Sequence, residues 1–138
     1  MLPINGQTSG TPIRQTSAAG TTGEASATLR IEALGWSALV RVLLATLALE
    51  RTLRVLNAIP RRKRRSATAS MPPEAAFRLA GACLGRSLAR GQYLRVRGYP
   101  SVLVIGGLGS VDAFHAHAWL DGDDPGDADF IELRRIAR

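Results

Sequence analysis

The sequence is poor in cysteine and aromatic residues, and each shortage excludes a class of protein. A single cysteine, Cys83, excludes an intramolecular disulfide and fits a reducing compartment, where a free thiol is either buried or reactive. Aromatic residues make up 5% of the chain and hydrophobic residues 46%, so a core must be built mainly from Leu, Val, Ile and Ala. A chain of 138 residues is long enough for one globular domain and short for two.

The sequence pattern favours neither a secretory signal nor a membrane-spanning helix. The uninterrupted apolar stretch between Arg41 and Glu50 has only eight residues, whereas crossing a bilayer takes roughly 20. The N-terminus has no cationic start followed by an apolar stretch, so it does not resemble a secretory signal. We therefore expect a cytoplasmic protein.

Acidic residues are outnumbered, with 11 Asp and Glu against 18 Lys and Arg and a formal net charge of +7. The densest basic run, RRKRR at residues 61–65, lies between Pro60 and the small polar residues SATAS, which indicates an exposed linker. One hypothesis is a nucleic-acid or anion-binding module that uses Arg61 to Arg65. The alternative is a solvated linker, because no aromatic residue is interleaved with the run and no zinc-finger spacing accompanies it.

Composition divides the chain into a tail and one domain. Residues 1–27 are rich in Thr, Ser, Gly and Ala with hardly an apolar run, which predicts a disordered tail. Residues 28–138 then form a single domain whose first part, residues 28–98, is helical. From Leu29 to about Ala58 we expect one helix, or two joined near Gly35, ended by the proline that follows.

A second helical zone begins at MPPEAAFRLA, where Pro73 suits a first helical turn and Glu74 favours the positive end of the helix dipole. Gly81 interrupts it, and we expect the next helix to start near Cys83 and to end at Gly98. The sulfur would then lie in the first turn, where unpaired N–H groups favour a nucleophilic thiolate. The alternative is a small buried hydrophobe at a tight helix crossing.

After the helices the period of the sequence changes, and residues 99–138 are expected to form a small antiparallel sheet. The run YPSVLVIGG predicts a buried strand over about residues 101–105. The segment GDDPGD is typical of a turn, and ADFIEL predicts a third strand that runs back. The fold class is therefore α+β, with N-terminal helices packed on the sheet.

The second predicted strand in chain order, AFHAHAWL, would direct alternate side chains to opposite faces of the sheet. Phe114, Ala116, Ala118 and Leu120 would face the core. The remaining members, His115, His117 and Trp119, would share the other face.

A hairpin centred on Asp123 would bring a histidine and an aspartate together. His117 and Asp129 each lie six residues from that centre and would face each other with Cβ atoms roughly 5 Å apart. The carboxylate would fix the tautomer of the imidazole, and Cys83 packed against this face would complete a Cys-His-Asp triad. The register is an assumption, because a slip of one residue turns Asp129 to the opposite face.

Other interpretations of these residues stay open. His115 and His117 form an H-x-H pair that could bind zinc with Cys83 or an aspartate. The acidic residues between 121 and 127 lack the spacing of a calcium loop, so most are turn formers. The histidines could also be structural and the thiol inert, in a non-catalytic interaction protein. No nucleotide cofactor is expected, because GGLGSVD lacks the lysine and the helix of a phosphate loop.

The order of motifs over residues 82–130 is similar to that of a known family. It comprises Cys83-Leu84 with Arg86, a basic helix that ends at a glycine, the strand VLVIGG, the signature AHAW at residues 116–119, and Asp129 twelve residues after the histidine. This ordered set resembles the transglutaminase-like core of the lasso-peptide maturation protease, the leader peptidase of bacterial lasso-peptide gene clusters. It departs from the usual pattern at Gly85, where that family commonly has proline.

The resemblance implies a transglutaminase-like or papain-like core and a cysteine peptidase that removes the leader peptide before macrolactam cyclisation. It assigns Cys83 as nucleophile, His117 as general base and Asp129 as the orienting carboxylate, whereas His115 matches no required position. It implies no cofactor and three partners: the precursor peptide, a leader-recognition adaptor protein and an ATP-dependent cyclase. With no strand-rich recognition domain before residue 80, the chain corresponds to the stand-alone protease half of a split system.

Overall fold

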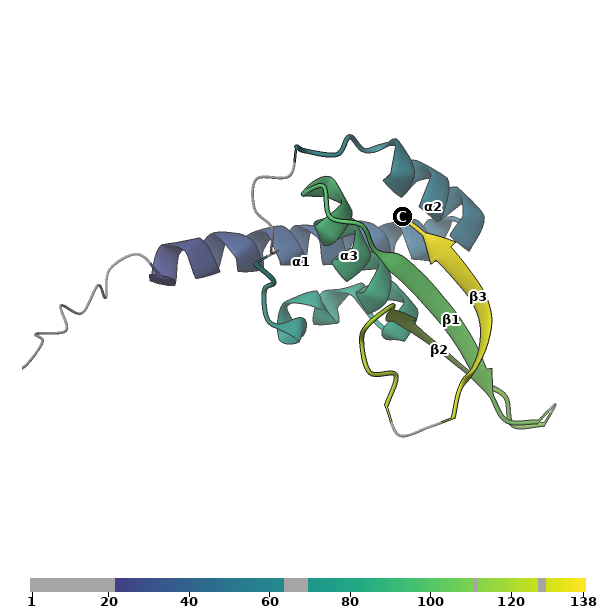
Figure 1. Ribbon diagram of the computed structural model, residues 1–138. Helices are drawn as coiled ribbons and strands as arrows, with labels where there is room; N and C mark the ends of the chain where they lie inside the picture. Colours follow the sequence, from purple (N-terminus) through teal and green to yellow (C-terminus); the bar gives the residue numbers. More distant parts are fainter. Residues whose placement is uncertain (1–21, 64–69, 111, 127–128) are drawn as a thin grey trace, which may run out of the picture.

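Helices and a small antiparallel sheet make up the computed structural model, which confirms the predicted α+β class (Figure 1). It describes residues 22–63, 70–110, 112–126 and 129–138, with the backbone alone for 22–26. Within these ranges four helices pack against three strands. Their order is α1 (Thr22–Thr46), α2 (Leu49–Ala58), η1 (Glu74–Ala80, a 3₁₀ helix), α3 (Cys83–Val96), β1 (Val102–Leu108), β2 (His115–Leu120) and β3 (Ile131–Ala137).

The two N-terminal helices differ in their limits from the sequence-based prediction. Helix α1 begins at Thr22, inside the range 1–27 predicted as a tail, and residues 1–21 lie outside the described part. It runs unbroken through Gly35, and the break comes at Ala48, whose backbone is extended. Neither proline nor glycine stands near this break, which therefore follows from tertiary packing: α2 turns so that Leu53 and Leu56 reach the core. Helix α2 ends before Pro60, as predicted.

The core is built between the helices and the inner face of the sheet. Its largest fully buried side chains include Leu56, Phe77, Leu88, Tyr93 and Leu103. The rings of Phe77 and Tyr93 meet edge to face, with centroids 6.0 Å apart and an interplanar angle of 81°, an arrangement that aromatic pairs prefer. Aliphatic residues thus supply most of the core, as the composition predicts, around one aromatic pair that joins η1 to α3.

A buried arginine fixes α2 to α3. Arg95 donates hydrogen bonds to the backbone oxygens of Leu56, Asn57 and Ile59 at 3.2, 2.6 and 2.7 Å, and Gln92 donates to the Leu56 oxygen at 3.1 Å. These carbonyls lie at the C-terminal end of α2, where a helix leaves its last oxygens without the usual partner four residues on; the Leu56 oxygen also accepts from the N–H of the C-cap residue Ile59, at 3.3 Å. Burial lowers the pKa of Arg95. Part of the positive charge of the chain is therefore structural, and composition alone does not separate it from charge that would bind a ligand.

The strand order corrects one prediction. The sheet has the order β2-β1-β3, with β1 antiparallel to both neighbours, so β2 and β3 do not form a hairpin. The predicted cross-strand pair of His117 and Asp129 is therefore wrong, because the residue opposite His117 is Gly106 of β1. The most apolar strand takes the central position, where both of its edges are hydrogen-bonded. Strand β3 begins at Ile131 and is displaced from the predicted ADFIEL segment, of which residue 128 lies outside the described ranges.

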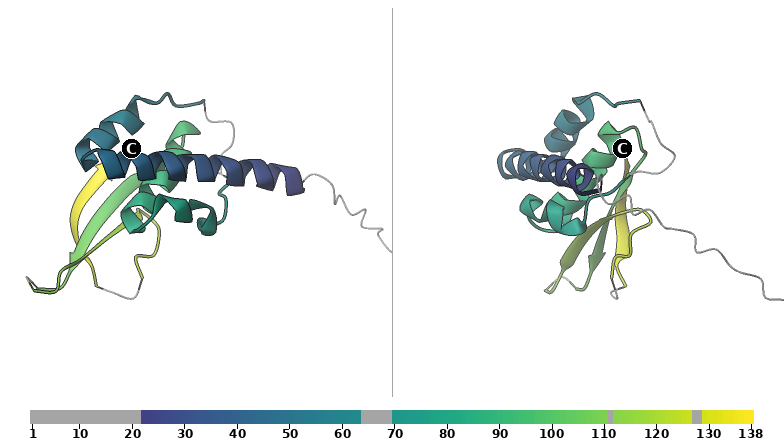
Figure 2. Two further views of the ribbon diagram at one scale, coloured as in Figure 1. Left: turned by 180° about the vertical axis from the view of Figure 1, so that it is seen from behind. Right: turned by 90° about the vertical axis from the view of Figure 1, so that its left-hand side faces the viewer.

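The face assignment of β2 is correct near the helices and wrong at the far end. Ala118 and Leu120 are buried, as predicted, whereas Phe114 and Ala116 are exposed. Figure 2 shows that the strands extend past the helical layer at one end. No second layer covers Phe114 there among the described residues, and its ring lies over Gly107, where it comes within 2.6 Å of the place of a Cβ atom.

Candidate active site

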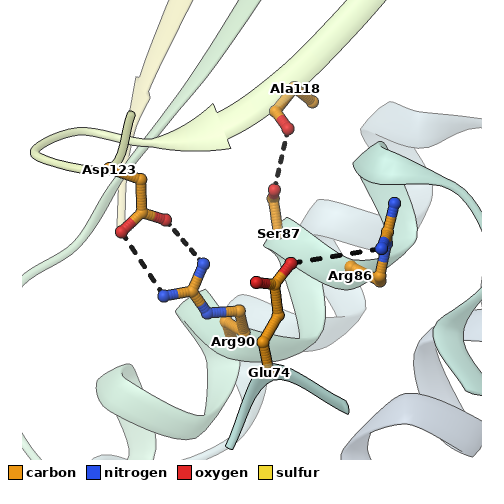
Figure 3. Close-up of polar contacts among 6 residues, drawn as sticks. All are labelled: Glu74, Arg86, Ser87, Arg90, Ala118 and Asp123. Carbon is orange, nitrogen blue, oxygen red and sulfur yellow. Dashed lines mark hydrogen bonds and ion pairs between the residues drawn. The ribbon is translucent and has the colours of Figure 1, made fainter. Parts of the chain in front are cut away.

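A pocket of about 320 Å³ lies between the N-terminal part of α3, strand β2 and the turn that follows β2. Figure 3 shows the polar contacts around it. The pocket is lined by Glu74, Cys83, Arg86, Ser87, Arg90, His117, Ala118, Trp119, Asp123 and Asp124. The structure therefore brings Cys83 and His117, two of the three residues predicted for catalysis, to one cavity.

Cys83 is the first residue of α3, in agreement with the sequence-based prediction. Its side chain is half-buried, and no side chain caps the helix at Ala82. The N–H groups of a first helical turn have no partner within the helix and attract negative charge. The carbonyl oxygen of Ala80 occupies the space that a Cβ atom on Gly85 would fill. A glycine two residues after the cysteine thus lets η1 pack directly against the first turn of α3.

His117 is held by two aromatic rings. Its imidazole stacks on Trp119 of the same strand, with ring centroids 5.8 Å apart, and on Phe130, with centroids 5.1 Å apart. The interplanar angles are 22° and 26°. Phe130 lies directly before β3, on the far side of β1 from His117. The ring contact therefore crosses the central strand.

Gly106 makes this crossing possible. It lies opposite His117 in β1, and a Cβ atom there would come within 2.7 Å of Trp119 Cη2 and within 3.1 Å of the Ile131 oxygen. Contacts this short between carbon atoms are strongly repulsive, because their optimal separation is about 3.5–4.0 Å. A glycine in a central strand otherwise weakens the strand. Here the missing side chain leaves the space that the neighbouring aromatic rings occupy.

Substitution of Gly106 by alanine is expected to lower the free energy of unfolding by about 1–3 kcal/mol, the usual cost of overpacking. Gly35→Ala is the matched control: Gly35 is an exposed helix residue with nothing within 4 Å of the added methyl group. That change should raise the free energy of unfolding by about 0.5–1 kcal/mol. Chemical denaturation followed by circular dichroism measures both. Equal stability of Gly106→Ala and wild type would show that the rings have room to move aside.

Asp129 lies close to this cluster in sequence but outside the pocket lining. It is exposed, and it directly precedes Phe130, whose ring stacks on His117. Among the residues that the structure describes, no hydrogen bond joins its carboxylate to the imidazole. His115, at the start of β2, is exposed and also absent from the pocket lining.

The acidic residues after β2 serve the turn and its ion pairs. Asp121 pairs with Arg135 at 2.8 Å and Asp123 with Arg90 at 2.6 Å. An oxygen of Asp124 accepts a hydrogen bond from the Gly126 N–H at 2.9 Å, a turn-forming contact of the predicted kind. Asp127 lies outside the described residues. No group of three His, Cys, Asp or Glu side chains suited to a metal ion occurs in the described ranges.

The pocket lining includes Ser87, Arg90 and Asp123, none of which was predicted as a site residue; Asp123 was expected only as the centre of a turn. Ser87 and Arg90 follow Cys83 by four and seven residues, and helical spacing places all three on one face. This spacing could have predicted that Ser87 and Arg90 lie on the same face of the helix as the cysteine. Asp123 carried no comparable signal, because turn aspartates are common for reasons unrelated to a site.

The remaining predicted features contribute no side chain to the pocket. Arg61 to Lys63 are exposed, and Arg64 and Arg65 are outside the part of the chain that is described. Within the described segments, no helix has the length and apolar character needed to cross a membrane.

Comparison with known proteins places the fold in a family. The family model of the transglutaminase-like superfamily matches residues 25–134, a range that includes Cys83, His117 and Asp129. No curated protein and no solved structure matches the chain. The family match spans most of the 138 residues and includes every helix and strand in whole or in part. The chain therefore belongs to the transglutaminase-like superfamily.

Proposed function

We propose that this chain is a cysteine peptidase with Cys83 as nucleophile and His117 as general acid and base. The observation that carries the proposal is the shared pocket of these two side chains, with the sulfur at an uncapped helix N-terminus. Members of the transglutaminase-like superfamily are often cysteine-dependent enzymes, which supports the assignment of Cys83 as nucleophile. Both roles need the two groups close together, and their common place in the lining of one pocket supports this.

The proposed reaction begins with attack of the Cys83 thiolate on the carbonyl carbon of the scissile amide. Negative charge develops on the carbonyl oxygen, where the unpaired N–H groups of the first turn of α3 can stabilise it. The His117 imidazolium donates its proton to the amide nitrogen, the C–N bond breaks and the amine leaves. Water then loses a proton to His117, attacks the thioester, and releases the acid and the thiolate.

Asp129 is the proposed third member, which orients the imidazole of His117. Its support is its place in the chain, one residue before the ring that stacks on His117, together with the motif order of the lasso-peptide proteases. A carboxylate in this role selects the tautomer and stabilises the imidazolium. The structure shows no hydrogen bond between the described Asp129 and His117 side chains, and catalytic hydrogen bonds often form or tighten only when substrate binds.

Asp129→Asn is expected to lower kcat by roughly 10²–10⁴-fold, since an amide cannot stabilise the imidazolium. Its effect on the free energy of unfolding should stay within about 0.5 kcal/mol, because the side chain is exposed. Steady-state cleavage rates test the first statement and thermal melting tests the second. Asp112→Asn, at another exposed aspartate, is the matched control. Equal rates for the two variants would remove Asp129 from the mechanism.

At a finer level, the proposed substrate is the precursor of a lasso peptide, from which this chain removes the leader before macrolactam cyclisation. The support is the ordered set of motifs over residues 82–130. The proposed partners are a leader-recognition adaptor protein and an ATP-dependent cyclase. The exposed apolar side chains of α1, among them Ile31 and Val42, offer one surface for such a partner.

The test is incubation of the purified chain with a precursor peptide encoded beside its gene, with and without the leader-binding protein encoded there. Mass spectrometry should detect a leader that ends in a free carboxylate and a core with a new amino terminus. A leader joined to an added amine in place of water would assign the chain to acyl transfer. An unchanged precursor in the presence of both proteins would contradict the proposed substrate.

A further inference from the structure

One face of α3 carries three polar residues in successive turns, and two of them, Ser87 and Arg90, bond to β2 or to the turn after it. Cys83 begins the helix, Ser87 follows one turn later and Arg90 about two turns later. Cys83, Ser87 and Arg90 all line the pocket, and Figure 3 shows Ser87 and Arg90 reaching across to the strand side. The helix that supplies the nucleophile is thus tied to the strand that supplies the histidine.

The first tie is a buried hydrogen bond. The Ser87 hydroxyl donates to the backbone oxygen of Ala118 at 2.9 Å, and the serine is only 6% exposed. Ala118 directly follows His117, and β2 is an edge strand of the described sheet, with β1 as its neighbour. A buried hydroxyl needs a partner, and this one finds it one residue from the imidazole.

The second tie is an ion pair with two contacts. Arg90 donates from both terminal nitrogens to the Asp123 carboxylate, at 2.6 and 3.3 Å. The two side chains are 24% and 31% exposed. The Asp123 N–H donates to the Leu120 oxygen at 2.9 Å, so the carboxylate belongs to the turn that closes β2. A two-contact pair of this kind fixes orientation as well as distance.

We propose that Ser87 and the Arg90–Asp123 pair form an α3–β2 clamp that sets the separation between the Cys83 sulfur and the His117 imidazole. The inference rests on the proposed function and adds positioning residues to it. One tie alone would leave a pivot about which the helix can swing. Two ties, one beside His117 and one beyond the end of β2, fix both the position of α3 along the strand and its angle to it. The effect matters because a displacement of about 1 Å can cost roughly 10²-fold in rate.

The clamp predicts the reactivity of one thiol. Cys83 is the only cysteine of the chain, so alkylation by iodoacetamide at pH 7, followed by mass spectrometry of the intact protein, reports on it alone. A neighbouring imidazole raises the thiolate fraction and hence the rate. We expect His117→Ala to slow the alkylation by about tenfold. Ser87→Ala, Arg90→Gln and Asp123→Asn should each slow it by roughly threefold or more for the same reason.

The direction of change separates positioning from a structural role. Local loosening would expose the half-buried thiol and speed up alkylation, whereas loss of the imidazole partner slows it. Two matched variants test contacts of the same kind away from the pocket, one at the C-cap of α3 and one between the segment after α3 and Gly91 of the helix. Arg97→Gln breaks the Arg97–Glu32 pair, which has a 2.7 Å contact and side chains 22% and 27% exposed. Ser101→Ala removes a buried hydroxyl that donates to the Gly91 oxygen. Both should react at the wild-type rate.

The outcomes distinguish the clamp from the function on which it rests. If His117→Ala reacts as fast as wild type, the pairing of Cys83 with His117 is wrong, and the proposed peptidase mechanism fails with it. If His117→Ala is slow but the clamp variants react at or above the wild-type rate, the clamp alone is overturned. Arg90→Gln and Asp123→Asn probe the same pair from the helix and from the turn, so failure of one to fold leaves the other as the test.

Discussion

Cys83→Ala is expected to lower the rate of precursor cleavage by on the order of 10⁴-fold or more, because no other group can form the covalent intermediate. Within the described residues the sulfur is the one thiol of the pocket. The folded state should persist, since the side chain is half-buried and alanine is the best helix former. Cleavage rates measured by mass spectrometry at matched protein concentration provide the check.

Two further measurements make this result specific. Circular dichroism should show wild-type helix content and a Tm within a few degrees of wild type, as expected for loss of about 1 kcal/mol or less. Cys83→Ser keeps the size of the side chain and supplies a much weaker nucleophile, so it should be almost as inactive as the alanine variant. Wild-type cleavage by folded Cys83→Ala protein would exclude the peptidase mechanism altogether.

The helical half of the site was largely predictable because its signals are local. Gly81 has a positive φ of 91° and Cys83 opens the next helix, so the place of the sulfur followed from a breaker and a helical period. The break at Ala48 carried no such signal, because it depends on where the apolar face of α2 meets the core. A local sequence pattern predicts which residues are helical. It predicts less well where one helix ends and the next begins.

In the sheet half, the buried residues of β2 were predictable near the helices, whereas its exposed far end and the strand beside it were not. A period of two determines that Ala118 and Leu120 point to the core, and both are buried. It does not determine which strand lies beside β2, since that depends on pairing between distant segments. The expected hairpin contact between His117 and Asp129 therefore failed, while the structure joins the same two regions through rings that cross Gly106.

The ring stack on His117 separates two roles that a single substitution would confuse. His117→Ala removes both the proton carrier and the surface on which Trp119 and Phe130 pack, so it should cost roughly 0.5–1.5 kcal/mol of stability for each ring contact. His117→Phe keeps an aromatic ring in the stack and has no nitrogen. It should preserve more of the stability and none of the acid and base chemistry.

Both substitutions are expected to lower kcat by roughly 10²–10⁴-fold, the usual contribution of a positioned general acid and base. His115→Ala is the matched control, because His115 lies on the same strand two residues earlier, is exposed and lines no part of the pocket. Its cleavage rate should stay close to wild type. Steady-state kinetics together with thermal melting distinguish loss of chemistry from loss of fold. If His117→Phe cleaves as fast as His115→Ala, the imidazole carries no proton in the reaction, and the ring is there only to pack against Trp119 and Phe130.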